Sequence, residues 1–507
     1  MLRRTFLRSA LAAATVAALP RSNLFAALYQ SALRDVPDIT AVTGDGREVM
    51  LPGRDVAELA ARLRGRLLLA GDAGYEDARH ILNPTFDRRP ALIAQVTGAA
   101  DIQAAVDFAR DRGGLLTAVK CGGHSFSGLS TCDRGLMIDL SSFRSVRVDP
   151  IARRAWVTGG SLLGSVDHET MAHGLVSTFG TVSHTGVGGL VTAGGFGRLG
   201  RRFGLSIDNL ESVQVVTADG RLLHASAEEN EELFWGVRGG GGNFGVVSHF
   251  EFRLHPMQRR VLGGKISFPY SKAREALALY AAYGPEAPDE LNIDLAVGLP
   301  PGGGDGHATF ELCYSGPESG AERALAPIRK LGTPVSDTVA GVDYVALQRS
   351  GDYDDPRALG VYLKSGFLSG ITPALIADIV DGLAGHPERL TQVAFAQCGG
   401  AIGRVAPQAT ALSQRDAQFI MLGITGWPHG KGIDGAAHME YMRTLWAGLE
   451  TRTHGFYTAD LTPDATAQEI RANFQANHER LVAVKNLYDP TNLFRLNANV
   501  KPTVQEA

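Results

Sequence analysis

The sequence predicts an α+β protein made of two lobes. The chain has 507 residues, which is longer than the roughly 250–300 residues at which a single hydrophobic core stops growing. From Val96 onward, helix-like and strand-like apolar patterns alternate. The 61 glycines exceed the usual share of roughly 7%, and they gather in loops without a repeat period. Such loops suit close approach to a ligand, because glycine has no side chain to hold the ligand away.

The first residues have the pattern of an export signal. Arg3-Arg4-Thr5-Phe6-Leu7-Arg8 fits the twin-arginine motif, and an Ala-rich apolar segment over residues 9–20 follows it. That segment is too short to span a bilayer, and no other segment offers about 18 apolar residues. We therefore expect a twin-arginine signal peptide over residues 1–27 and export, periplasmic or extracellular, through the twin-arginine machinery. An ordinary amphipathic helix is the alternative.

The region after the signal predicts a helix, short strands and one hairpin. Apolar residues recur at helical spacing over residues 102–109, and Gly113-Gly114 ends that helix. Asp219-Gly220 lies between two apolar runs, which is a strong signal for a β-hairpin. This lobe should end near Pro256. The strand-like runs are 115–120, 136–140, 155–158, 213–217 and 221–224.

The second half carries sparser signals. Alternating patterns over residues 261–457 predict an α+β lobe with an antiparallel sheet. Thr372-Pro373 opens a helix there, since proline is tolerated at the first helical position. The glycine-rich run 300–306 is expected to be a connector. Thr466-Ala-Gln-Glu469 is a capping box that opens one helix ending before Pro490, and residues 492–499 follow as an extended segment.

Composition narrows the function classes. The hydrophobic share of 44% and the charged share of 20% are typical of a globular protein. A net charge of −4 gives no electrostatic reason to expect nucleic acid or an anionic membrane as partner. The cysteines show no CxxC or Cys/His spacing, so no metal site is expected. They are Cys121, Cys132, Cys313 and Cys398. An exported protein could pair Cys121 with Cys132, and the sequence leaves that open.

Two glycine-dense loops carry the main functional signal. Lys120-Cys-Gly-Gly-His-Ser125 ends a strand-like run, and Gly186-Val-Gly-Gly-Leu-Val-Thr-Ala-Gly-Gly-Phe-Gly197 follows later. Glycine lets a bulky anion approach main-chain N–H groups, and a His beside a pyrophosphate can contact or join a cofactor ring. Ordinary tight turns with a solvated His are the alternative. Residues 195–200 also satisfy GxGxxG, but no strand precedes them, so a Rossmann site is not expected.

These loops belong to a longer series of motifs in a fixed order. The others are Gly71-Asp-Ala-Gly-Tyr-Glu-Asp-Ala-Arg79, Asn83 with Asp87-Arg-Arg-Pro90, Gly180-Thr-Val-Ser-His-Thr-Gly186, Ser206-Ile-Asp-Asn-Leu210, Trp235-Gly-Val-Arg-Gly-Gly-Gly-Gly-Asn-Phe-Gly245 and Tyr488-Asp-Pro-Thr-Asn-Leu-Phe-Arg-Leu-Asn497. Over most of the chain, the series resembles the berberine-bridge-enzyme-like FAD-linked oxidases of the vanillyl-alcohol-oxidase/PCMH flavoprotein superfamily.

The resemblance implies a domain plan and a cofactor. A PCMH-type FAD-binding domain would cover 84–258, within a lobe of two subdomains that begins near residue 36. A substrate-binding lobe would cover 259–460. The segment 461–507 would return to the FAD lobe. His124 would be joined to the 8α-methyl of FAD. The residues implied at the cofactor are Lys120, Gly122, Gly123, His124, Ser125, Gly128, Gly180, Thr181, Gly186, Gly188, Gly189, Gly194, Gly197, Val247, Asn497 and Asn499, with residues 240–247 near the ribityl chain or ring.

The chain departs from the family pattern beside the second loop. Many relatives have a Cys for a second flavin attachment where this chain has Val182, and valine cannot form a thioether. We therefore expect one covalent bond, through His124 alone. Thr185 falls where relatives place the residue that gates oxygen, and its small side chain favours an oxidase.

The resemblance leaves the catalytic base unknown. Gln414 stands where the family usually has a His, and Gln cannot act as a base. Asn473, Phe474 and His478 stand where relatives often have tyrosines that line the substrate pocket. His184 is a weak candidate, for which a structural His bonded to the backbone is the alternative.

The expected function is that of an exported FAD-linked oxidase. It would oxidise an alcohol, amine or sugar-like small molecule by hydride transfer to flavin N5 and reduce O2 to H2O2. A dehydrogenase with another electron acceptor and a flavin-binding protein with little turnover remain as alternatives. Resemblance at the level of the fold does not transfer the identity of the substrate.

Overall fold

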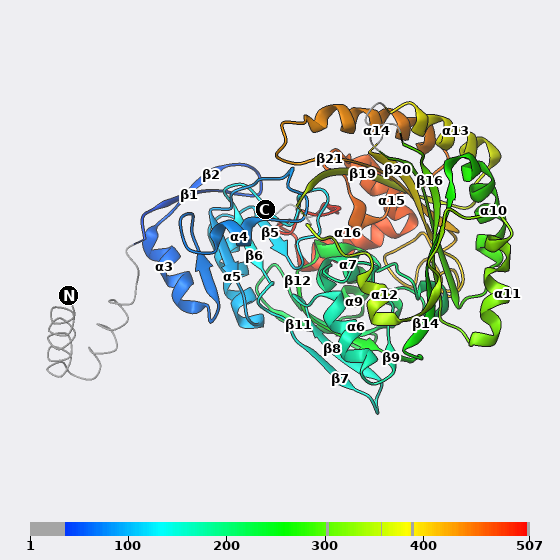
Figure 1. The fold of residues 1–507 in the computed structure, drawn as a ribbon. Helices are drawn as coiled ribbons and strands as arrows, with labels where there is room; N and C mark the ends of the chain where they lie inside the picture. Colours follow the sequence, from blue (N-terminus) through cyan, green and yellow to red (C-terminus); the bar gives the residue numbers. More distant parts are fainter. Residues whose placement is uncertain (1–35, 301–303, 356, 387–389, 504–507) are drawn as a thin grey trace, which may run out of the picture.

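The computed structural model describes residues 36–300, 304–355, 357–386 and 390–503. The expected signal peptide at 1–27 lies outside these residues, and so do residues 301–303 of the expected connector at 300–306. The described chain forms two lobes (Figure 1). In the part of the chain that the structure describes, no helix has the length and apolar character needed to cross a membrane.

The first lobe begins with a small mixed sheet. Its strand order is β3 (Arg66–Leu68), β4 (Leu92–Gln95), β6 (Leu136–Asp139) and β5 (Thr117–Lys120). Strand β6 pairs in parallel with both β4 and β5. The predicted helix appears as α5 (Ala99–Asp111), and α3 (Gly53–Arg62) and α4 (Tyr75–Arg79) accompany it. A hairpin of β1 (Ile39–Val42) and β2 (Glu48–Leu51) precedes them.

A second, antiparallel sheet completes the first lobe. Its order is β11 (Leu222–Ser226), β10 (Leu210–Val216), β12 (Val246–Arg253), β8 (Arg154–Thr158) and β7 (Val146–Asp149). The predicted hairpin is confirmed, since Val216 pairs with Leu222 across Asp219-Gly220. Its helices are α6 (Leu163–Met171), α7 (Val187–Ala193), α8 (Gly200–Phe203) and α9 (Glu231–Val237). The GxGxxG run lies between α7 and α8 and follows no strand. A two-residue pairing of β9 (Leu175–Val176) with β13 (His255–Pro256) closes the lobe.

The second lobe is built on an eight-stranded antiparallel sheet. The order is β17 (Ser336–Asp337), β14 (Arg260–Pro269), β16 (His307–Tyr314), β15 (Leu291–Leu299), β20 (Thr391–Gln397), β21 (Phe419–Pro428) and β19 (Leu359–Leu368), while β18 (Ala340–Asp343) pairs with β14. This confirms the expected α+β lobe. The short helix α12 (Tyr344–Arg349) leads into β19.

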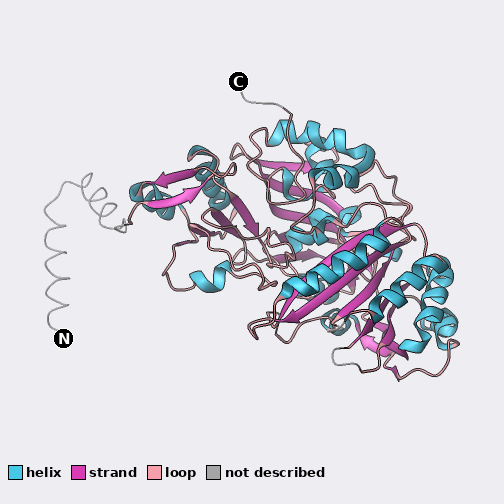
Figure 2. Ribbon diagram, turned by 90° about the horizontal axis from the view of Figure 1, so that it is seen from above, coloured by secondary structure: helices cyan, strands magenta, loops and turns pink. Residues whose placement is uncertain are grey.

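Helices cover one face of the large sheet. They are α10 (Ala273–Glu286), α11 (Glu318–Arg329), α13 (Pro373–Ala384) and α14 (Gly435–Glu450), and they lie on the outer side of the molecule (Figures 1 and 2). Alternate strand residues such as Leu295 and Phe310 pack against Leu277 and Ile379 of these helices. Helix α13 begins as predicted, because the Thr372 hydroxyl accepts from the Leu375 N–H at 3.2 Å. The opposite face of the sheet turns toward the first lobe.

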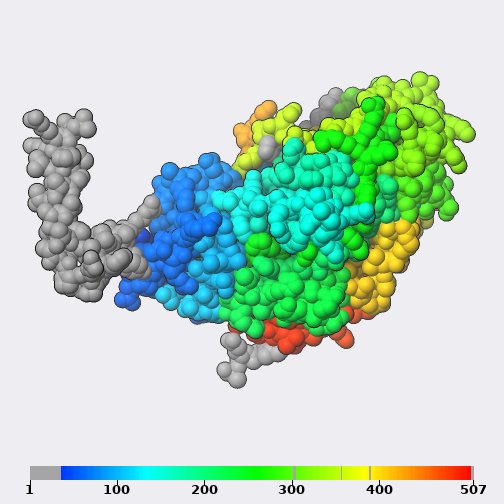
Figure 3. All heavy atoms as spheres, turned by 90° about the horizontal axis from the view of Figure 1, so that it is seen from below, coloured from blue at the N-terminus to red at the C-terminus, as the bar shows by residue number. Residues whose placement is uncertain are grey.

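The C-terminal segment returns to the first lobe. The capping box at Thr466 and Glu469 opens α15 (Ala467–Phe474) as predicted. The single helix expected up to Pro490 is wrong, because Gln475 has a φ of 48° and separates α15 from α16 (His478–Tyr488). Helix α16 packs its buried side on α9, and the red C-terminal part of the chain lies on the surface beside green residues (Figure 3).

Candidate functional site

A cavity of about 580 Å³ lies where the two lobes meet. The first lobe contributes residues from its loops at 121–130, 180–196 and 241–247, and the C-terminal segment contributes residues from 494–498. The second lobe closes it with residues that include Tyr353, Leu422 and Tyr457. The cavity is therefore formed by segments that lie far apart in the sequence.

Close contact between Gly122 and Gly186 brings the two predicted glycine loops together. A Cβ built on either residue would collide with the backbone nitrogen of the other. Only glycine allows this approach. The second loop is held from behind by the start of α6, where the Leu163 N–H donates to the Thr185 carbonyl at 3.0 Å. The side chains of His124, His184 and Thr185 meet as a result.

His124 has a hydrogen-bond partner at each ring nitrogen. Its Nε2 lies 2.6 Å from Nδ1 of His184, and its Nδ1 lies 3.3 Å from the Thr185 hydroxyl. Burial, reinforced by His184, lowers the pKa of His124 to about 4. The ring is therefore neutral at ordinary pH and keeps the lone pair that a nucleophile needs.

Most residues that the resemblance implies at the cofactor line this cavity. They are Gly122, Gly123, His124, Ser125, Gly180, Thr181, Gly186, Gly188, Gly189, Val247 and Asn497, together with Thr185. Among the described residues, five others do not line it: Lys120, Gly128, Gly194, Gly197 and Asn499. Lys120 points away from the cavity, because its ammonium group donates to the Ala78 carbonyl. Gly197 packs on the carbonyl of Phe179, and Gly128 packs on the ring of Phe86.

The cavity has the features of a site for a large, polar cofactor. The Ser130 hydroxyl oxygen and Oδ1 of Asn497 are buried and have no hydrogen-bond partner among the described residues. Added Cβ atoms on Gly189, Gly241 and Gly242 would meet no atom within 4 Å, so the backbone is uncovered there. Exposed backbone and unpaired polar atoms fit a ligand such as FAD, which carries a pyrophosphate and a polar ring edge.

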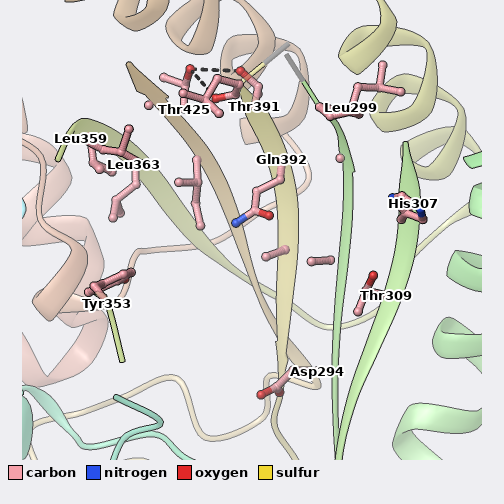
Figure 4. A pocket seen from close by; sticks show the side chains of 18 of the residues that line it. Asp294, Leu299, His307, Thr309, Tyr353, Leu359, Leu363, Thr391, Gln392 and Thr425 are labelled. Carbon is pink, nitrogen blue, oxygen red and sulfur yellow. Dashed lines mark hydrogen bonds between the residues drawn. The ribbon is translucent and has the colours of Figure 1, made fainter. Parts of the chain in front are cut away.

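A second cavity of about 750 Å³ adjoins the first. Phe126, Tyr353, Leu363 and Ile424 line both of them. In Figure 4, Gln392 points into this cavity from β20, Thr309 and His307 lie on one side, and Leu359, Leu363 and Tyr353 lie on the other. The inner face of the large sheet thus carries a cleft with one polar and one apolar wall, open to the glycine-loop cavity.

Comparisons with known proteins identify the family. A family model described as "FAD binding domain" matches residues 90–226, and one described as "Berberine and berberine like" matches residues 465–501. The chain is 31% identical over 451 residues to (R)-6-hydroxynicotine oxidase of Paenarthrobacter nicotinovorans, covering 87% of this chain and 97% of that protein. This chain belongs to the berberine-bridge-like FAD-linked oxidoreductases.

Two further comparisons support the assignment of this chain to the FAD-linked oxidoreductases. An FAD-linked oxidoreductase of Dictyostelium discoideum is 31% identical over 452 residues, with 88% of this chain and 97% of that protein covered. A crystal structure of 6-hydroxy-D-nicotine oxidase from Arthrobacter nicotinovorans has a TM-score of 0.77 at 29% identity and covers 87% of this chain and 98% of that chain. The predicted fold, family and FAD dependence of the oxidoreductase are thereby confirmed.

Three residues that line the site of this oxidoreductase were not predicted from its sequence. Tyr353, Tyr457 and Asp460 line the glycine-loop cavity from the second lobe. Burial raises the pKa of Asp460 to about 7, and a hydrogen bond with the Ser365 hydroxyl opposes that rise. The Tyr457 hydroxyl accepts from the Gly195 N–H at 3.2 Å. No glycine motif marks these residues, and only the pairing of distant strands brings them to the cavity.

The positions where relatives often have tyrosines lie away from both cavities, and so does Gln414, which stands where the family usually has a His. Asn473 and Gln414 are buried and bonded to each other, with 3.1 Å between Gln414 Nε2 and Asn473 Oδ1. Phe474 is buried in the core between the C-terminal helices and the first lobe. His478, half-buried, begins α16. Within the described residues, tyrosines reach the cavities from positions 353 and 457 instead.

The open question of a disulfide is answered by the geometry. Cys121 and Cys132 are both free thiols. The Cys121 thiol faces the Gly159 carbonyl at 2.8 Å, and Cys132 packs in a separate apolar cluster with Met137 and Ala118. Burial raises the pKa of Cys121 to about 11 and that of Cys132 to about 12, so both remain protonated.

Proposed function

We propose that this chain is an exported FAD-linked oxidase that carries its flavin on His124 alone. The observation that supports this most is the neutral His124 ring, held between His184 and Thr185 in the glycine-loop cavity. Valine at position 182 supports a single attachment. The twin-arginine pattern supports export, although it lies outside the described residues. A covalent bond would prevent loss of the cofactor outside the cell.

The cleft on the large sheet supports a substrate with both polar and apolar groups. Gln392, His307 and Thr309 offer hydrogen bonds on one wall, while Leu363 and Tyr353 offer apolar contact on the other. The family includes proteins named xylooligosaccharide oxidase and chitooligosaccharide oxidase besides the hydroxynicotine oxidase. We therefore propose an alcohol, amine or sugar-like small molecule, bound with its reacting carbon toward the glycine-loop cavity.

The cavity also offers a group that can take the substrate's proton. FAD, when bound, supplies a two-electron acceptor for a hydride and a route for those electrons to O2, giving H2O2. Oxidation of an alcohol or amine carbon also releases a proton from oxygen or nitrogen, which a base must accept. Asp460 lines the cavity, and its pKa of about 7 suits proton transfer near neutral pH. The small side chain of Thr185 leaves room for O2.

A His124→Ala substitution tests the attachment. The purified protein is denatured in acid, and the flavin absorbance and intact mass of the precipitate are measured, with His173→Ala as the matched control because His173 is exposed. We expect one flavin of added mass in the wild type and in His173→Ala, and none in His124→Ala. Free flavin in the wild-type supernatant would contradict the covalent bond, and absence of flavin would contradict the cofactor.

Substrate oxidation under air and without oxygen separates the remaining alternatives. Equimolar H2O2 with fast reoxidation of the bleached flavin by air supports the oxidase. Bleaching that only an artificial acceptor reverses would identify a dehydrogenase. A flavin that no alcohol, amine or sugar bleaches would favour the binding protein with little turnover.

A further inference from the structure

A short segment of the second lobe lies directly on the loop that carries His184. We call residues 351–353 the strap. Its first residue must be glycine, because a Cβ on Gly351 would lie 2.6 Å from the Thr181 carbonyl oxygen. Its second residue, Asp352, accepts hydrogen bonds from the Ser183 backbone N–H at 2.7 Å and from the Ser183 hydroxyl at 2.6 Å. The strap thus follows the loop residue by residue.

The third strap residue contacts His184 itself. The Tyr353 backbone N–H donates to Nε2 of His184 at 3.4 Å, and the two rings lie 5.5 Å apart between centroids. A nitrogen that accepts this bond carries no proton, so a neutral His184 ring has its proton on Nδ1. That N–H points at Nε2 of His124, 2.6 Å away. His184 therefore donates to His124.

The chain of contacts runs from the second lobe to the attachment residue. With Nε2 accepting from His184, the neutral His124 ring carries its own proton on Nδ1, where the Thr185 hydroxyl lies 3.3 Å away. A ring held at both nitrogens keeps one orientation in the cavity. Loss of the His184 bond would free the ring to rotate, and productive orientation is what an intramolecular bond-forming step needs.

We propose that His184 is a positioning residue for flavin attachment and that the strap holds it in place, so that attachment requires contact between the two lobes. The inference rests on the proposed bond between His124 and FAD. Attachment joins a ring nitrogen of His124 to the 8α carbon, and one proton leaves the ring and one leaves the methyl group. The two electrons released reduce the isoalloxazine, and O2 or another two-electron acceptor then removes them.

The first test compares His184→Ala with His184→Asn. FAD is added to apoprotein from riboflavin-limited cells, and the covalent fraction is followed by acid precipitation and intact mass, beside non-covalent FAD binding. The Asn side-chain amide can donate where Nδ1 of His184 does. We expect attachment to be at least roughly tenfold slower in His184→Ala, with FAD still bound, and largely restored in His184→Asn. Wild-type attachment rates in His184→Ala would overturn the proposal.

The second test removes the hydrogen bonds between the strap and the His184 loop, at residues that do not line the cavity. Asp352→Ala, Ser183→Ala and the double variant are compared with Asp354→Ala, an exposed carboxylate two residues along the same segment. Asp352→Ala removes both hydrogen bonds and Ser183→Ala removes only the hydroxyl bond. We therefore expect attachment to slow more in Asp352→Ala than in Ser183→Ala, and the double variant to be no slower than Asp352→Ala. Attachment in Asp352→Ala as fast as in Asp354→Ala would overturn the role of the strap. A wild type without covalent flavin would instead refute the proposed function.

Discussion

At the scale of single residues, the site depends on side chains that burial keeps uncharged. His124 is neutral because its ring is buried beside a second imidazole, so one ring nitrogen stays unprotonated over the whole physiological range. Asp460 shows the same effect with the opposite sign, since burial favours the protonated acid and raises its pKa to about 7. One cavity thus holds an imidazole and a carboxyl group whose pKa values are both shifted by the same exclusion of water.

An Asp460→Asn variant tests the proposed base. A base must be unprotonated to accept the substrate's proton, so kcat/KM should rise with pH through about 7 in the wild type. Asparagine cannot accept the proton, and we expect a loss of roughly 10²–10⁴-fold in flavin reduction together with loss of this pH dependence. The measurement is anaerobic stopped-flow reduction of the flavin from pH 5 to pH 9.

Asp460→Glu is the matched control, because it keeps the carboxylate. It should retain a rising limb, although shifted, while covalent flavin remains at the wild-type level in both variants. If Asp460→Asn keeps the wild-type pH profile, Asp460 is not the base.

The sequence predicted best those site residues whose loop conformation is determined by their neighbours along the chain. His124 and the glycines around it form local loops, and a positive φ or a close backbone approach is a property of the loop itself. Tyr353 and Asp460 lie in segments without such a motif. Lys120 and Asn499 do not line the cavity, because the sequence places a residue in a loop but does not tell which way its side chain points.

At the scale of elements, capping residues in the sequence predicted where helices begin, but nothing in the sequence predicted where a helix breaks. The caps at Thr372 and Thr466 are visible as single residues followed by their partners, and both open helices as expected. The break at Gln475 had no such signal, because neither glycine nor proline stands there. Ile470 and Phe474 of α15 pack in the same core as Leu481 and Val484 of α16, so both sides of the break at Gln475 face one cluster.

A buried ion pair anchors the C-terminal segment. Lys485 of α16 and Asp489 lie 2.6 Å apart with both side chains fully buried. Asp489 also accepts from the backbone N–H groups of Leu493 and Phe494 at 2.7 and 2.9 Å. Lys485 donates in turn to the Asn243 carbonyl at 2.8 Å. The pair therefore turns the chain back so that Asn497 reaches the cavity.

Asp489→Ala should loosen this whole segment. Removing one member of a buried pair leaves an uncompensated charge, which costs about 3–5 kcal/mol of unfolding free energy. Equilibrium denaturation measures that loss, and limited proteolysis should cut after α16 only in the variant. The exposed Glu479→Ala in the same helix is the control and should be neutral. Unchanged stability in Asp489→Ala would contradict the anchoring role.

At the scale of the whole molecule, a buried polar network joins the lobes. Asp167 of α6 accepts from the Gln348 amide of α12 at 3.3 Å, and Gln348 in turn accepts from Arg198 at 2.9 Å. Arg198 also pairs with Glu311 on β16. None of these contacts follows from sequence spacing, because each joins segments more than a hundred residues apart. The sequence therefore predicted each lobe but could not predict the contacts between the lobes.

The network makes the stability of the molecule depend on pH. Burial raises the pKa of Asp167 from 3.8 to about 7, so between those values the unfolded chain has lost a proton that the folded protein keeps. Stability should therefore fall as pH rises from about 4 to about 7, by roughly 1.4 kcal/mol for each unit of pKa difference. Asp167→Asn cannot ionise, so its unfolding temperature should decline less steeply over this range and exceed that of the wild type at pH 8. The exposed Asp77→Asn is the control and should follow the wild type. Parallel unfolding curves for Asp167→Asn and the wild type across this range would show that Asp167 is ionised in the folded protein.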